Sequence, residues 1–158
     1  MLTFGRIPRQ KSGEKFEAGV SEDKRALTLT FSSLRVHVGG KSRASMVTRL
    51  FTLALPLKGD EPRAEIEFTL DCFVITTPGA TASLVCSINA QTTVADFPEN
   101  TDQSFLHTFK LAAETPSEAR LCVLLLVGRD STNLDAEADL SVSSLDAELL
   151  PRPPGPSQ

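Results

Sequence analysis

The chain has 158 residues, 41% of them hydrophobic and 23% charged, and its formal net charge is −4. That length suits one domain with a sizeable core, and three cysteines without C-x-x-C spacing argue against a disulfide framework or a zinc site. The longest apolar run, 121–127, is too short for a membrane span and the N-terminus lacks a signal-peptide core, so we expect a cytoplasmic or otherwise intracellular chain.

The two ends of the chain have the composition of irregular structure. Residues 1–24 mix Gly, Pro, Lys and Glu with isolated apolar residues, which predicts an irregular N-terminal arm. Residues 151–158 contain four prolines, which cannot donate to a strand ladder. We therefore expect a single folded domain over residues 25–150, followed by a disordered Pro-rich tail.

Alternating apolar residues predict six or seven strands between these ends. The alternation runs over residues 27–38, 47–55, 66–74, 82–90, 105–111, 121–127 and 136–149. A helix over residues 135–150 is the alternative for the last segment, because Ala, Glu and Leu favour helix.

The clearest alternation, over residues 65–91, is interrupted by a Pro-Gly turn and predicts a half-buried β-hairpin. A three-residue loop at 78–80 would place Cys72 directly across from Cys86. We interpret both residues, together with Cys122, as reduced core thiols, because buried thiols are unreactive. A redox-active pair is the alternative.

The run 121–127 is apolar on both faces, which is typical of a central strand covered on both sides. Short strands around one such member predict an all-β fold. We expect an antiparallel β-sandwich of jelly-roll or Greek-key type, with a closed β-barrel as the alternative.

The first and last predicted strands share a pattern. Leucines and valines alternate over 29–38 and again over 140–149, and in both segments the inward phase slips by one residue at a Ser-Ser pair. Such a slip is typical of a β-bulge or of a strand that changes sheets. We therefore predict that these two strands lie side by side.

No motif marks a catalytic residue or a cofactor site, and no stretch resembles a named family. His37 is expected in solvent, whereas His107 falls between Phe105 and Phe109 on the same side of its strand. A core or rim histidine is the favoured interpretation of His107. A small-ligand or enzymatic site in a cleft near His107 is the alternative to a non-catalytic function.

The loop after the apolar run offers oxygen ligands for calcium. Asp130, Asn133 and Asp135 are weak calcium candidates, since clustered carboxylates favour this ion. The spacing does not match an EF-hand and lacks its central glycine. A turn with solvated acids is the favoured interpretation.

The aromatic composition of the chain argues against some classes of binding partner. The chain has no Trp and no Tyr, so it lacks the amphipathic rings on which sugars and unpaired bases stack. Its basic residues are too sparse for a polyanion-binding arm. We expect neither glycan nor nucleic acid nor membrane as the partner.

Charge is distributed unevenly along the chain. Residues 1–60 hold 11 Lys and Arg against 5 Asp and Glu, while residues 61–158 hold 5 against 15. We therefore expect a non-catalytic structural or interaction module that self-associates or docks in a larger assembly. The candidate contact residues are Arg6, Arg9, Lys11, Arg43, Arg49 and His107. The basic residues among them are expected to contact the acidic residues at 130–146 of another copy.

Overall fold

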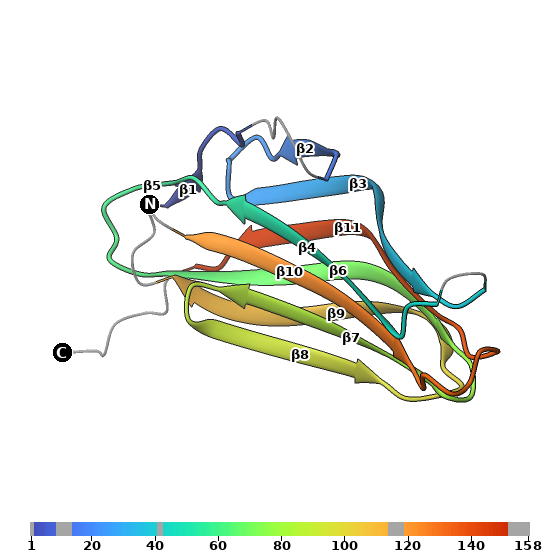
Figure 1. Cartoon of the computed structure of the whole chain (residues 1–158). Helices are drawn as coiled ribbons and strands as arrows, with labels where there is room; N and C mark the ends of the chain where they lie inside the picture. The colour runs from blue at the N-terminus through green and yellow to red at the C-terminus, as the bar shows by residue number, and fades with distance from the viewer. Residues whose placement is uncertain (1, 9–13, 41–42, 114–118, 152–158) are drawn as a thin grey trace.

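The chain folds into two stacked antiparallel sheets and a short two-stranded ribbon (Figure 1). The computed structural model describes residues 2–8, 14–40, 43–113 and 119–151. Strands and their connections account for all of these residues. Within the described ranges there is no apolar helix of the length that a bilayer crossing requires.

The two sheets are built from the long strands of the chain. The five-stranded sheet has the order β2 (Phe16–Val20), β3 (Ala26–Val38), β11 (Ala138–Leu149), β6 (Ala64–Thr76) and β9 (Asp102–Ala113). The four-stranded sheet has the order β4 (Met46–Ala54), β10 (Arg120–Arg129), β7 (Ala80–Ile88) and β8 (Gln91–Phe97). The ribbon pairs β1 (Thr3–Phe4) with β5 (Leu57–Lys58).

The strand order identifies the type of sandwich. Apart from β2, one sheet reads β3-β11-β6-β9 and the other reads β4-β10-β7-β8, so strands that are distant in sequence alternate within each sheet. This is the eight-stranded jelly-roll arrangement. The predicted β-sandwich is confirmed, and the alternative of a closed barrel is wrong.

The core lies between the sheets, where alternate residues of every long strand are apolar and buried. Leu29 and Leu140 of the five-stranded sheet and Leu84 and Leu125 of the four-stranded sheet are each 0% exposed. Outward positions along the same strands are rich in carboxylates on the five-stranded sheet and nearly free of charge on the four-stranded sheet. That difference identifies the site described below.

The N-terminal segment, expected to be irregular, contributes β1 and β2. Phe16 of β2 packs edge-on against Phe51, with ring centroids 5.6 Å apart, and Phe51 lies 4.9 Å from Phe31. Edge-to-face rings at such distances attract one another in addition to burying area. The aromatic cluster thus holds β2 against the open edge between β3 and β4. Residues 152–158 of the predicted tail lie outside the described residues.

The predicted hairpin over residues 65–91 is wrong. β6 and β7 leave the turn at Gly79 in different sheets, β6 pairing with β9 and β11 and β7 pairing with β8 and β10. Each strand covers one side of the same core, and this produces the same alternation as a hairpin with one buried face. Cys72 and Cys86 are therefore not cross-strand neighbours.

The predicted pairing of the first and last long strands is confirmed. β3 and β11 are antiparallel neighbours, and their register shifts between Val142 and Ser144, at the Ser-Ser pair of β11. Val142 is paired with Leu34 and Ser144 with Thr30, so the shift also spans the Ser-Ser pair of β3. The alternative of a helix over residues 135–150 is wrong, because this segment is strand β11.

Candidate functional site

The outer surface of β10 is not covered by the described part of the chain, although the sequence predicts a strand that is covered on both sides. Leu121, Val123 and Leu125 point into the core and are 0% exposed. Leu124 and Leu126 alternate with them, point outward, and are only half-buried. The expected cover on both sides of β10 is thus present on one side only within the described chain.

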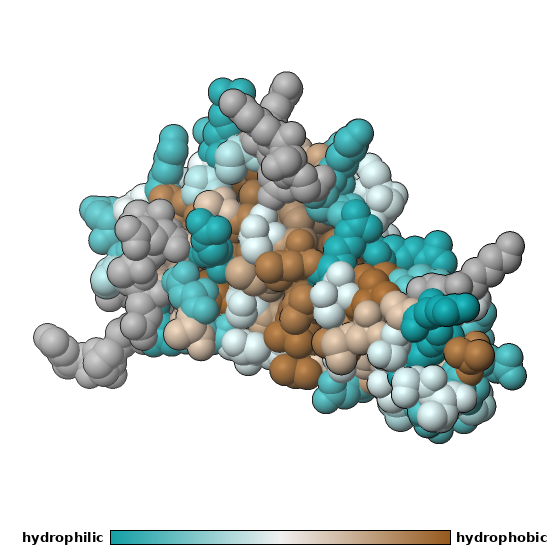
Figure 2. Space-filling model, in the orientation of Figure 1, coloured by the Kyte–Doolittle hydropathy of each residue, from teal (hydrophilic) through white to brown (hydrophobic). Residues whose placement is uncertain are grey.

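Leu124 belongs to a row of apolar side chains that crosses the sheet. It pairs with Leu50 of β4 on one side and with Val85 of β7 on the other, and Val85 pairs with Val94 of β8. Leu50 is 59% exposed and Val94 is 56% exposed. Figure 2 shows a hydrophobic band across the middle of the sheet formed by β4, β10, β7 and β8. We call Leu50, Leu124, Val85 and Val94 the apolar row.

Apart from Asp96, the positions on either side of the apolar row are small, apolar or hydroxyl-bearing. We call the whole outer surface of β4, β10, β7 and β8 the four-stranded face. Besides the apolar row, it comprises Met46, Thr48, Thr52, Ala54, Thr81, Ser83, Ser87, Thr92, Asp96, Arg120, Cys122, Leu126 and Gly128. Arg120 and Asp96 are the charged residues among these positions, one of each sign. The face is therefore close to electrically neutral.

The opposite surface of the sandwich is polar. We call the outward positions of β2, β3, β11, β6 and β9 the five-stranded face. Against the cations Arg35 and Lys110, it presents the carboxylates of Glu17, Glu65, Glu67, Asp71, Asp102, Asp139, Asp146 and Glu148. Three exposed apolar side chains also occur on it: Phe73 and Ile75 follow one another along β6, and Leu106 of β9 lies diagonally across from Phe73. Each of the three is paired directly across the strands with polar residues only, so they do not form a row across the sheet.

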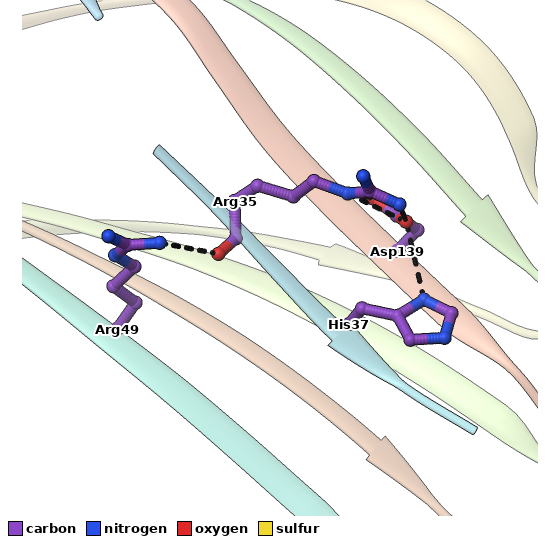
Figure 3. Close-up of polar contacts among 4 residues, drawn as sticks. All are labelled: Arg35, His37, Arg49 and Asp139. Atoms are coloured by element: carbon purple, nitrogen blue, oxygen red, sulfur yellow. Dashed lines mark hydrogen bonds and ion pairs between the residues drawn. The ribbon is translucent and has the colours of Figure 1, made fainter. Parts of the chain in front are cut away.

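A polar cluster on the five-stranded face joins β3 and β11 (Figure 3). Nε of Arg35 donates to both carboxylate oxygens of Asp139 at 2.9 Å, and Nδ1 of His37 lies 3.3 Å from Oδ2 of Asp139. The hydrogen bond to Asp139 raises the pKa of Arg35. This cluster is a cross-strand polar contact on a flat sheet surface.

Arg49 is engaged within the chain. Its Nη1 donates to the backbone oxygen of Arg35 at 3.3 Å (Figure 3). Its Nη2 lies 2.6 Å from Oε2 of the buried Glu14. Its guanidinium thus ties β4 to β3 and to the segment before β2. Arg6 and Arg43 are exposed, and their role in a contact between copies stays a prediction.

The remaining charged candidates do not strengthen that prediction. Arg9 and Lys11 lie outside the described residues. In the acidic region, Asp139 is paired with Arg35 and Asp146 accepts a hydrogen bond from Thr28 at 2.6 Å. Because these two carboxylates have partners on a neighbouring strand, they give no support to a charge-driven contact between copies.

His107 points inward at the β9 edge of the sandwich. Its ring lies 5.1 Å from that of Phe109, and its Nε2 is buried without a hydrogen-bond partner, as is Oγ1 of Thr93. Burial lowers the pKa of His107. One hollow of about 650 Å³ is lined by Arg25, Arg63 and Leu149 among others, and a second borders β2. Neither hollow is lined by His107, so the cleft alternative gains no support from them.

The calcium candidates stabilise their own loop. Oδ1 of Asp130 accepts hydrogen bonds from the backbone N–H and the hydroxyl of Thr132, which lower the pKa of Asp130. Oδ1 of Asn133 accepts from the backbone N–H of Asp135. These are turn contacts. Among the described residues, no three His, Cys, Asp or Glu side chains are grouped as metal ligands would be.

The three thiols have different environments. Cys72 and Cys86 are free and buried, and burial raises the pKa of each to about 12. The nearby Cys86 adds to the shift of Cys72, which is consistent with the two facing one another across the core. Cys122 is half-buried on the four-stranded face next to the apolar row, so its expected place in the core is wrong.

Neither a protein-family model nor a curated protein sequence matches the chain. Similar solved structures include a ruminal GH26 endo-β-1,4-mannanase, with 14% identity over 72% of this chain and 20% of that one, at a TM-score of 0.32. TmCBM61 in complex with β-1,4-galactotriose has 10% identity over 90% and 98%, at 0.39. The enzymatically active domain of bacteriophage CBA120 tailspike protein 4 has 12% identity over 95% and 19%, at 0.37. The chain thus spans about a fifth of the mannanase and of the tailspike chain.

These comparisons correct one expectation about partners. The absence of Trp and Tyr argues against glycan, yet a protein in complex with β-1,4-galactotriose is among the similar structures. Stacking on aromatic rings is one way to hold a sugar, and hydrogen bonding to hydroxyl side chains is another. Glycan is therefore not excluded as a partner.

The sequence analysis does not predict most residues of the apolar row as part of a site. Leu50, Val85 and Val94 each occupy the outward phase of a strand whose inward phase also carries apolar residues. The available signal was apolar residues in the outward phase of adjacent strands. Using it requires the strand order, which places the four positions in one row.

Proposed function

We propose that the chain is a non-catalytic interaction module that binds a protein surface through the four-stranded face. The observation that carries this proposal is the apolar row, which crosses all four strands, with Leu50 and Val94 exposed and Leu124 and Val85 only half-buried. Contiguous apolar patches of more than a few hundred Å² are uncommon on monomers and mark interaction surfaces.

The physical argument rests on β10. A strand that is apolar on both faces is normally covered on both faces, and within the described chain only the inner face of β10 is covered. Each apolar Å² left in water forgoes about 25 cal/mol of stabilisation. A protein surface packed on Leu124 and its neighbours would recover this free energy.

Cys122 offers a direct test, because its thiol lies on the four-stranded face whereas Cys72 and Cys86 are buried with pKa values of about 12. Thiol-labelling rates are compared between a native cell extract and the purified protein at high dilution. We expect Cys122 to react more slowly in the extract, where its face is covered.

The matched control moves the reporter to the other surface. In a Cys122→Ser/Thr108→Cys variant, the new thiol replaces an exposed residue of the five-stranded face. It should label at the same rate in the extract and at high dilution. Equal rates for Cys122 itself under both conditions would show that the four-stranded face stays uncovered, which would refute the proposed function.

A further inference from the structure

We infer that the occupant of the four-stranded face is a second copy of this chain, whose own four-stranded face packs against it in a twofold-symmetric dimer. The inference rests on the proposed function and specifies its partner. It follows from the charge, the pattern and the area of the face.

The charge of the face selects a neutral partner. Arg120 and Asp96, which lie on different strands, are its charged residues. A nucleic acid or a strongly charged peptide would leave its own charges unpaired here and desolvated, which is costly. Asp96 lies on the edge strand β8, where it accepts a hydrogen bond from the Ser83 hydroxyl, and Arg120 is the first residue of β10. Both charges therefore lie at the border of the face, where they stay in contact with water when a second copy covers the apolar row.

The pattern of the face is complementary to itself. On one side the apolar row is flanked by a row with hydroxyls at Thr52, Ser87 and Thr92, and on the other by a row with hydroxyls at Thr48 and Ser83. A twofold rotation about an axis along the apolar row, in the plane between two copies, lays apolar side chains on apolar side chains. It also lays the two flanking rows on one another, so that Thr52 faces Thr48, Ser87 faces Ser83, Cys122 faces Leu126 and Thr92 faces Asp96 across the contact. Twofold interfaces require such self-complementary patches.

The area suffices for a modest dimer. Four strands about 4.8 Å apart and nine residues rising about 3.3 Å each give a footprint of roughly 500 Å² per copy. Two copies together cover roughly 1,000 Å², the lower limit for specific protein interfaces. We therefore expect a dimer that dissociates on dilution, in the micromolar range or weaker.

Sedimentation of the purified full chain tests the inference. From about 1 μM to about 1 mM, the weight-average mass should rise from the monomer value towards twice that value. Because apolar burial holds the contact, raising the salt from low to high ionic strength should not dissociate the dimer. A chain that stays monomeric to about 1 mM would overturn the inference.

Two matched variants locate the contact. Leu124→Lys puts a charge at the centre of the apolar row and should weaken dimerisation by at least about tenfold. Leu106→Lys puts the same charge on the five-stranded face, at a leucine that is 68% exposed, and should leave dimerisation unchanged. Circular dichroism confirms that each variant is folded. A dimer that persists unchanged in Leu124→Lys would also overturn the inference.

The outcomes separate this inference from the proposed function. If purified protein is monomeric at all concentrations while Cys122 is protected in the extract, a different protein covers the face and only the second-copy inference fails. If Cys122 is protected in neither setting, the proposed function fails as well. Protection that grows with the concentration of the pure chain alone supports both.

Discussion

The two outer faces of the sandwich rest on one core but present opposite chemistry to solvent. The five-stranded face carries carboxylates and the Arg35–Asp139 pair, as a solvated sheet surface should. The four-stranded face carries the apolar row and a single charge of each sign. Since both sheets satisfy the same core, the core does not dictate this difference. The contact that we propose for the four-stranded face would account for the difference.

The largest effect should come from removing a side chain on which both faces depend. Leu125 is 0% exposed on the inner side of β10, and Leu125→Ala should lower the free energy of unfolding by about 2–5 kcal/mol. Leu124→Ala removes the same atoms from the outer side of β10. In dilute solution it should cost at most about 1 kcal/mol. Urea denaturation measures both, and equal losses would contradict the division into inner and outer sides.

The inward thiols predict a loss of stability at alkaline pH. Burial raises the pKa of Cys72 and Cys86 from 9.0 to about 12, so the folded chain holds these protons at a pH where the unfolded chain releases them. Stability that is fully present below pH 9 should therefore fall as pH rises towards 12, by about 1.4 kcal/mol per thiol per pH unit. In denaturation series above pH 9, Cys86→Ala should halve the contribution of the thiols to this slope, and an unchanged slope would contradict the assignment.

The turn that carries the chain from one sheet to the other should tolerate change less than an open strand position. Gly79 has a φ of +88°, and a Cβ there would lie 2.8 Å from Nδ2 of Asn133. Gly79→Ala should cost about 1–3 kcal/mol. Gly19→Ala in β2 is the matched control, because nothing lies within 4 Å of its added Cβ. Thermal unfolding should separate the two variants, and equal melting temperatures would be inconsistent with strain at the turn.

The smallest effect should come from the polar pair on the five-stranded face. Asp139→Asn removes the partner of Arg35, whose side chain is 60% exposed while that of Asp139 is 18% exposed, so it should cost about 1 kcal/mol, and less at high salt. On the other face, Asp96 accepts a hydrogen bond from the Ser83 hydroxyl at 2.6 Å. Any loss in Asp96→Asn should be independent of salt. A large, salt-insensitive loss at Asp139 would mean that the pair supports the fold and not only the surface.

Local patterns predicted the strands and one pairing correctly. Strand positions follow from a period of two, and the matching slips at the Ser-Ser pairs correctly placed β3 beside β11. The same period does not tell which sheet receives a strand. Two strands on opposite sides of the core therefore show the same sequence pattern as a hairpin with one buried face. For this reason the predicted pairing of Cys72 with Cys86 is wrong.

Of the candidate site, the sequence predicted only the strand at its centre. The run 121–127 correctly indicated a strand that is apolar on both sides. Because both of its phases are apolar, it carried no information about which phase faces the core, and Cys122 was placed inside. Leu50 and Val94 join Leu124 only through the strand order, which depends on contacts between residues far apart in the chain.

The place of β11 between β3 and β6 has a consequence for synthesis. On the ribosome β3 and β6 emerge early, yet the strand that joins them comes last among the strands of the domain. Until residues 138–149 leave the exit tunnel, both nascent strands keep an unpaired edge next to a long apolar face. Such edges are prone to aggregate, and pairings between distant segments form slowly. We therefore expect the growing chain to need chaperone protection until its last strand is made.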